Sequence, residues 1–159
     1  MIMRRIGALV AVAAAVGMAS VATAAPATAA PKLKGPEAIN PFLPTMNEGT
    51  SRLQMVNFRT DVRVCDVKLI VTPWGGALDV TYPDGPQGQQ RPFTLLNGNR
   101  QLDRREVDFA AFRVTVNNVS RSGWVILPAK VYYNYCGAKG KPRGLQVKEI
   151  GFVQPVRAR

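Results

Sequence analysis

The sequence contains no histidine, two cysteines, and ten acidic residues against twenty-one lysines and arginines. Without histidine the chain cannot form a Ser-His-Asp triad or an HExxH zinc site, and it lacks the commonest general base. Two cysteines are too few for a four-cysteine zinc site or an iron–sulfur centre. We therefore expect no metal and no cofactor, and the composition favours binding over catalysis.

The N-terminus has the layout of a secretory signal peptide. Two arginines near the start are followed by an uncharged run over residues 6–18 and then by small residues. Cleavage sites of the A-x-A type end at Ala24 and at Ala29, and we favour the second. The apolar run is shorter than the roughly 20 residues that a membrane span needs. We expect a signal peptide over residues 1–29, exported by the Sec or the twin-arginine route, and no transmembrane span in the mature form.

Cleavage after Ala29 leaves 130 residues with a net charge of +9, against +11 for the whole chain. A chain of this length can bury a core without metals or several disulfides. Export predicts an oxidising environment, in which Cys65 and Cys136 have one intramolecular pairing available. The sequence therefore predicts a protein with one disulfide that is secreted or associated with the cell wall.

Residues 30–50 contain four prolines and no sustained periodicity, which predicts a Pro-rich extended leader. From residue 51 to 159 short strands alternate with turns, and no helical pattern is convincing. Apolar and polar residues alternate over 65–71, 78–82 and 110–116. We expect residues 51–159 to form one all-β domain of about eight short antiparallel strands. The architecture is a β-sandwich, immunoglobulin-like in architecture only, or a compact barrel.

The turn sequences and the apolar spacing also predict strand pairing. The Pro-Trp-Gly-Gly turn over 73–76 predicts a hairpin between 65–71 and 78–82, and Asn97-Gly98 predicts a tight hairpin. Pro128 restricts its strand to an edge or a break. The apolar face shifts between Val147 and Ile150, which predicts a bulge near residues 148–149.

Two further expectations concern the first strand and the place of Cys65. Leu53, Met55 and Phe58 form the first candidate strand. Cys65 shares the apolar face of strand 65–71, and its separation from Cys136 suits a bridge between two sheets.

Basic residues occur in clusters, and an excess of positive charge steers a protein toward polyanions. An anionic cell-wall polymer, an acidic polysaccharide or another extracellular protein is the expected partner. Specific nucleic-acid recognition is not expected, since it needs more than charge. The candidate anion-binding residues are Arg100, Arg104, Arg105, Lys139, Lys141, Arg143, Arg157 and Arg159.

Three tyrosines precede Cys136, and tyrosine is common both at binding surfaces and in sandwich cores. On a strand, Tyr133 and Tyr135 share one face and Tyr132 lies on the other. All three are candidate contact aromatics, with packing in the core or at its rim as the alternative.

We therefore expect a small, secreted, basic binding module without enzymatic activity. One alternative is a protease inhibitor that presents the Gly137–Gly144 loop, although its glycines argue against a rigid reactive segment. A second alternative is a carboxylate-based glycan hydrolase that uses Asp79 or Asp84, although no spacing brings two carboxylates together.

Overall fold

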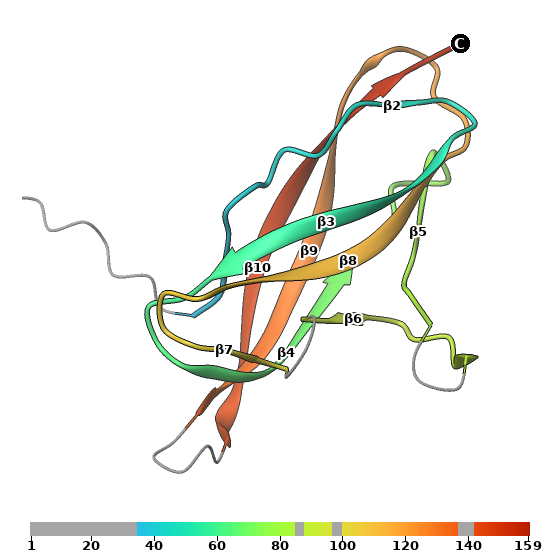
Figure 1. Ribbon diagram of the computed structural model, residues 1–159. Helices are drawn as coiled ribbons and strands as arrows, with labels where there is room; N and C mark the ends of the chain where they lie inside the picture. Colours follow the sequence, from blue (N-terminus) through green and yellow to red (C-terminus); the bar gives the residue numbers. More distant parts are fainter. Residues whose placement is uncertain (1–34, 85–87, 97–99, 137–141) are drawn as a thin grey trace, which may run out of the picture. The chain divides into compact units, whose positions relative to one another are not determined.

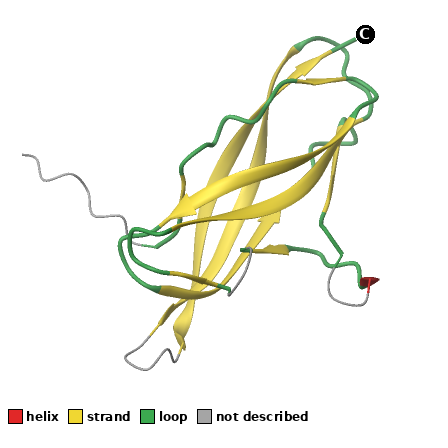
Figure 2. Cartoon of the chain, viewed as in Figure 1, coloured by secondary structure: helices red, strands yellow, loops and turns green. Residues whose placement is uncertain are grey.

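The computed structural model describes residues 35–84, 88–96, 100–136 and 142–159, which form two β-sheets without an α-helix (Figures 1 and 2). The four-stranded sheet has the order β1-β3-β8-β5. The six-stranded sheet has the order β2-β10-β9-β4-β6, and β7 also pairs with β4. The expected all-β, two-sheet architecture with one disulfide is confirmed. The strands are β1 (Glu37–Ala38), β2 (Met46–Asn47), β3 (Ser51–Arg59), β4 (Val64–Val71), β5 (Leu78–Thr81), β6 (Thr94–Leu95), β7 (Gln101–Leu102), β8 (Val107–Val116), β9 (Gly123–Cys136) and β10 (Pro142–Arg157).

Alternating side chains on the facing surfaces of the two sheets make the core. On β8 every second residue from Ala110 to Val116 is fully buried, as the sequence alternation predicts. Phe112 of β8 meets Phe152 of β10 with ring centroids 5.6 Å apart. Figure 1 shows β3 and β8 crossing β9 and β10, so the contact of these rings joins the two layers.

A buried glutamine pair also joins the layers. The Gln54 Nε2 atom of β3 donates to the Gln154 Oε1 atom of β10 at 3.3 Å, and both side chains are buried. The Gln154 amide donates in turn to the backbone carbonyl of Pro44 at 2.8 Å. Buried amides need such partners because an unsatisfied polar group in a core is costly.

The structure differs from the expected leader over 30–50. From Gly35 onward this segment belongs to the domain, because β1 pairs with β3 and β2 pairs in parallel with β10. Leu43 and Met46 are buried in the core. The prolines prevented an alternating pattern, yet short pairings and single apolar anchors are enough to fix the segment.

The predicted hairpin between strands 65–71 and 78–82 is wrong. β4 belongs to the six-stranded sheet, whereas β5 pairs with β8 in the four-stranded sheet. The Thr72 N–H donates to the Pro128 carbonyl at 2.7 Å, and the turn that begins at Trp74 then carries the chain to the other layer. A Pro/Gly turn between two alternating strands thus fits a crossing between sheets as well as a hairpin.

The Asn97-Gly98 turn lies outside the described residues, but the strands on either side of it are described. β6 and β7 both pair with β4, at Lys68–Leu69 and at Val64–Cys65, and not with each other. They follow one another along a single edge of the sheet. The tight hairpin expected there is therefore wrong.

Pro128 lies where β9 changes from an edge strand to a central strand. β9 pairs with β10 along its whole length, but its pairing with β4 ends at Ala129. The Pro128 carbonyl faces the β4 side, so its missing N–H removes no bond from the β9–β10 ladder. The expected restriction to an edge is correct for residues 123–128.

One other local expectation is wrong and one is confirmed. The irregularity of β10 lies between Arg143 and Leu145, where Gly144 has a φ of 67°, and not at residues 148–149. The candidate strand with Leu53, Met55 and Phe58 is present as β3, in which Leu53 and Met55 are exposed, whereas Gln54, Val56 and Phe58 are buried. Both faces of β3 carry apolar residues, so its sequence does not identify the buried face.

Candidate anion-binding groove

A groove lies between the segment after β5 and the outer face of the four-stranded sheet. One hollow of about 600 Å³ is lined by Leu53, Arg113 and parts of residues 80–84 and 90–92. A second hollow of about 410 Å³ adds Phe93, Arg100 and Phe109 among its lining. Pro83, Asp84 and Arg91 line both hollows, so the two form one feature, which we call the arginine groove.

Tyr82 fixes one wall of the arginine groove. Its hydroxyl accepts a hydrogen bond from the Val71 N–H at 2.8 Å and donates to the Val71 carbonyl at 3.0 Å. Because Val71 ends β4, these bonds tie the start of the 82–92 segment to the opposite sheet. Burial raises the pKa of the Tyr82 phenol, while the backbone hydrogen bond opposes that rise. The phenol therefore remains a neutral hydrogen-bonding anchor at physiological pH.

Three arginines line the arginine groove. Arg113 is exposed on β8, opposite Leu53 and Thr81. Arg91 is half-buried, and Arg100 is exposed with its backbone at a φ of 59°. Among the described residues, none of the three guanidinium groups forms an ion pair or a hydrogen bond. Asp84 is the one carboxylate among the described lining residues, so the arginine groove has an excess of positive charge.

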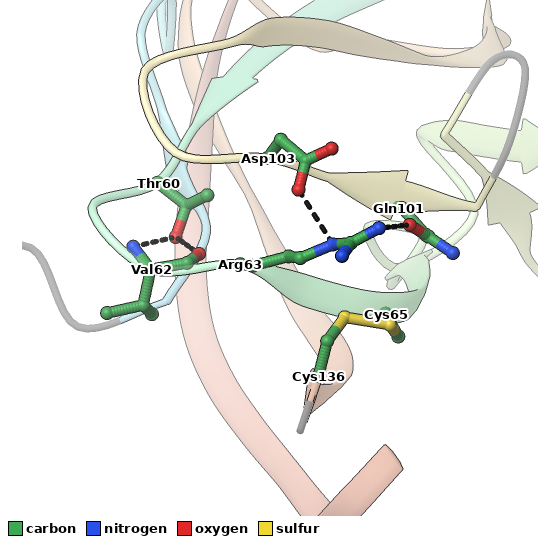
Figure 3. A network of polar contacts seen from close by, with 7 residues as sticks. All are labelled: Thr60, Val62, Arg63, Cys65, Gln101, Asp103 and Cys136. Carbon is green, nitrogen blue, oxygen red and sulfur yellow. Dashed lines mark hydrogen bonds and ion pairs between the residues drawn. A yellow bond between two sulfur atoms is a disulfide. The ribbon is translucent and has the colours of Figure 1, made fainter. Parts of the chain in front are cut away.

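Arg63 shows how an arginine with a structural role looks in the same molecule (Figure 3). Its Nε atom lies 2.8 Å from the Asp103 carboxylate, and its Nη2 atom donates to Gln101 at 2.7 Å. The Arg63 carbonyl accepts a hydrogen bond from the Cys136 N–H. The side chain thus joins β7 and the following turn to the segment that leads into β4. Its Nε and Nη2 atoms are thus engaged, and Arg63 is not among the described lining residues of the arginine groove.

The described members of the predicted basic clusters do not line one groove together. Arg104 and Arg105 lie in the turn between β7 and β8, where the Arg105 N–H donates to the Thr60 carbonyl, and neither lines the groove. Lys139 and Lys141 lie outside the described residues, and Arg143 is described only by its backbone place opposite Tyr135.

Arg157 and Arg159 lie at the end of the β9–β10 pair where β9 begins, whereas Arg143 lies at the end where β10 begins. Val156 pairs with Gly123, whereas Pro142 pairs with Cys136. Fourteen residues of extended β9 separate these two pairs by roughly 40 Å. Of the eight predicted anion-binding residues, Arg100 alone is found among the described lining of the arginine groove.

Sequence reasoning missed Arg91 and Arg113. Arg113 occupies a polar position of the alternating strand over 110–116, which predicted correctly that it faces away from the core. Nothing in the sequence places it in one groove with Arg91 and Arg100, because that arrangement depends on the crossing from β4 to β5.

Tyr133 is not a contact aromatic, since it is only 5% exposed. It packs edge-on against Tyr135, with ring centroids 5.6 Å apart. Burial, with smaller effects from the hydrogen bond and the charge of Tyr135, raises the pKa of Tyr133 to about 12. Tyr132 is half-buried on the other face of β9, so the expected alternation of faces is correct.

The disulfide between Cys65 and Cys136 is confirmed, but it does not join the two sheets. Cys65 lies opposite Asn134 on the neighbouring strand β9, so the bridge links two strands of one sheet. Asp66 has a φ of 54°, and the register shifts between Cys65 and Lys68. This bulge places Cys65 on the face opposite Val67, which corrects the expected shared face.

The residues of the two alternative functions are only partly described. Asp79 accepts a hydrogen bond of 2.7 Å from the Asn117 amide at one end of β5, and Asp84 follows the other end of that strand. Residues 137–141 of the proposed inhibitory loop lie outside the described residues.

Two searches of the described residues concern metals and membranes. They contain no group of three or more metal-ligating His, Cys, Asp or Glu side chains. Nor do they include a helix with the length and apolar character to span a bilayer.

No family model and no curated protein matches this chain. Among solved structures, a PapD-like domain of human CEP192 is 10% identical, with a TM-score of 0.41, and the match covers 88% of this chain and 96% of that one. AvmM, which catalyses macrocyclization in alchivemycin A biosynthesis, is 10% identical with a TM-score of 0.36 over 76% of this chain and 87% of that chain. A family 123 glycoside hydrolase from Clostridium perfringens is 11% identical with a TM-score of 0.34, over 72% of this chain and 22% of that chain.

Proposed function

We propose that this protein is an exported, non-enzymatic module that binds an anionic extracellular polymer through the arginine groove. The observation that carries the proposal is the lining of one groove by Arg91, Arg100 and Arg113 without an ion-pair partner among the described residues. A planar guanidinium donates parallel hydrogen bonds to carboxylate or phosphate, and such charge-assisted bonds are stronger than neutral ones.

A polymer fits this groove better than a small anion. The two hollows share Pro83, Asp84 and Arg91 in their lining, so successive anionic groups of one chain can meet different arginines. The net charge of +9 expected for the mature chain also raises the concentration of any polyanion near the protein. An anionic cell-wall polymer or an acidic polysaccharide has this repeating charge. The acidic surface of another extracellular protein is the alternative partner.

The proposed location outside the cell has two supports. The first is the signal-peptide layout of residues 1–29. The second is the Cys65–Cys136 disulfide, which is compatible with an oxidising extracellular environment.

Binding measurements on the chain from residue 30 onward, with its disulfide intact, test the proposal. The probes are polygalacturonate for carboxylate, inorganic polyphosphate for phosphate, and polyethylene glycol as a neutral polymer. Three neutralised contacts give a slope of about −2 for log affinity against log salt, by analogy with single-stranded nucleic acids. We expect one of the polyanions to bind, and its affinity to fall about 100-fold between 30 and 300 mM NaCl. Binding that does not change with salt, or no binding to either polyanion, would contradict the proposal.

A further inference from the structure

Both tryptophans of the chain line a third hollow, of about 670 Å³. Trp74 lies in the turn before β5 and is 51% exposed, and Trp124 lies in β9 and is 70% exposed. Large aromatic side chains gathered in one exposed hollow are typical of binding surfaces, where tryptophan contributes much of the affinity. This tryptophan groove shares no described lining residue with the arginine groove.

Asn117 holds the two segments of the tryptophan groove together. Its N–H donates to the Ala77 carbonyl at 2.9 Å, and its side-chain amide donates to the Asp79 carboxylate at 2.7 Å. Ala77 belongs to the Trp74 turn, whereas Asn117 begins the connection that leads to Trp124. The spacing between the two walls is therefore fixed by hydrogen bonds, which lowers the cost of ordering them around a ligand.

The aromatic surface continues beyond the hollow onto the outer face of β9. Phe42 lies edge-on to Trp124 with ring centroids 6.3 Å apart and is itself 65% exposed. Ile126, two residues after Trp124 on the same face, is exposed and lines the hollow itself, so Phe42 is the residue that extends the surface. The structure thus presents an extended apolar track instead of a closed pocket.

Polar side chains line the same hollow between the two tryptophans. Asn118, Ser120 and Arg121 belong to the lining, and their side chains form no hydrogen bond or ion pair with another described residue. Ser122 is engaged, because its hydroxyl accepts a hydrogen bond from the Ala158 N–H at 3.1 Å. The hollow therefore combines aromatic faces with unengaged donors and acceptors.

We propose that the tryptophan groove binds a neutral glycan chain. A hexose ring has apolar C–H faces bordered by hydroxyl groups, and it can stack on an indole while its hydroxyls bond to Asn118, Ser120 and Arg121. The apolar side chains of a peptide would cover these polar groups without giving them partners, which costs free energy, whereas each hexose ring offers several hydroxyl groups. Single-stranded nucleic acid also stacks on aromatic rings but needs a cationic track, and Arg121 is the one cation among the described lining residues.

Tryptophan fluorescence tests this proposal directly, because the whole tryptophan emission of the protein comes from the two residues of this groove. The chain from residue 30 is titrated with cellohexaose, chitohexaose, maltohexaose and mannohexaose. We expect one or more of these to shift the emission to the blue and to lower the acrylamide quenching constant at least threefold. The affinity should change less than twofold between 30 and 300 mM NaCl.

Variants separate this groove from its surroundings and from the arginine groove. Trp124→Ala should lower the affinity for the bound hexasaccharide at least tenfold. Asn117→Ala, which removes the side-chain bond to Asp79 and keeps the backbone bond to Ala77, should lower it at least threefold. Tyr132→Ser changes an aromatic of the same strand outside the groove and should have no effect. The variant Arg91→Gln, Arg100→Gln, Arg113→Gln should retain the affinity, so failure of the proposed function leaves this test intact. Equal melting temperatures show that the variants are folded.

Three results would overturn the proposal. One is that no hexasaccharide changes the emission or the quenching. Another is protection of the tryptophans from acrylamide only by an oligothymidylate, which would identify a nucleic-acid surface. The third is protection that increases with protein concentration alone, which would identify the track as an interface between copies of this chain.

Discussion

Arg63 and the arginines of the groove share one side-chain chemistry and differ in their surroundings. Arg63 forms an ion pair with Asp103 and a hydrogen bond with Gln101 beside the disulfide, as Figure 3 shows. Arg91, Arg100 and Arg113 lie along one groove with no partner among the described residues. Charge alone would treat all four residues alike. The difference shows that the partners of an arginine, and not its presence in a basic cluster, distinguish a structural role from a binding role.

The largest expected effect is on stability and concerns the disulfide in the region of Arg63. The double variant Cys65→Ser, Cys136→Ser opens a loop with a sequence separation of 71 residues. We expect the free energy of unfolding to fall by about 4 kcal/mol in the chain-entropy model. Urea denaturation followed by circular dichroism measures the change. A loss below about 1 kcal/mol would show that the Arg63 region does not depend on the bridge for its stability.

Removal of the Tyr82 hydroxyl should affect stability and binding together. Tyr82→Phe leaves the Val71 N–H and carbonyl without their partner, which costs about 1–3 kcal/mol. The change also removes the bonds that hold the Tyr82 wall of the arginine groove to β4, so the affinity for polyanion should fall several-fold. Tyr132→Phe removes the same atom where no hydrogen bond of the side chain is found within the described residues. Equal effects of the two changes would contradict the role of Tyr82 as an anchor.

Alkaline pH should weaken the wall of the arginine groove through its tyrosine anchor. The pKa values of Tyr82 and Tyr133 are raised in the folded protein, that of Tyr133 to about 12. The folded state then holds these protons more tightly than the unfolded state, so stability is full below pH 10 and falls as the pH rises from 10 to 12. Urea unfolding at pH 9 and pH 11 measures the loss. Tyr82→Phe should lose less than the parent, and an equal loss would contradict this account.

The smallest expected effect comes from Arg63 itself. Arg63→Gln removes an ion pair whose side chains are 48% and 38% exposed, so the free energy of unfolding should fall by no more than about 1 kcal/mol. Binding of polyanion should fall no more than for the loss of any other surface charge. A loss of affinity as large as that of Arg113→Gln would remove the distinction between the two regions.

The sequence predicted the inner faces of β4 and β8, because Val67, Leu69 and Phe112 alternate with polar residues. It did not predict the face of Cys65, because the bulge at Asp66 depends on pairing with β9. Nor did it predict the buried face of β3, where Gln54 is buried through its bond to Gln154, 100 residues away.

The same limit applies to the candidate grooves. Arg100 stood out because it lies near other basic residues in the sequence, whereas Arg91 and Arg113 are isolated there. Trp74 and Trp124 are 50 residues apart, and the bonds of Asn117 bring their segments together. Local patterns report which way a side chain faces within a strand. Convergence of side chains depends on which sheet each strand joins, and the crossing after β4 was not recognisable from its turn.

The most direct test of the central claim compares two variants with the same net charge. Arg91→Gln, Arg100→Gln, Arg113→Gln removes three charges from the arginine groove, and Arg104→Gln, Arg105→Gln, Arg157→Gln removes three outside it. With the polyanion that binds the parent protein, isothermal titration at 30 mM NaCl should show a 10- to 100-fold loss for the first variant and less than threefold for the second. Equal losses in the two variants would contradict the claim, because binding would then follow net charge and not the groove.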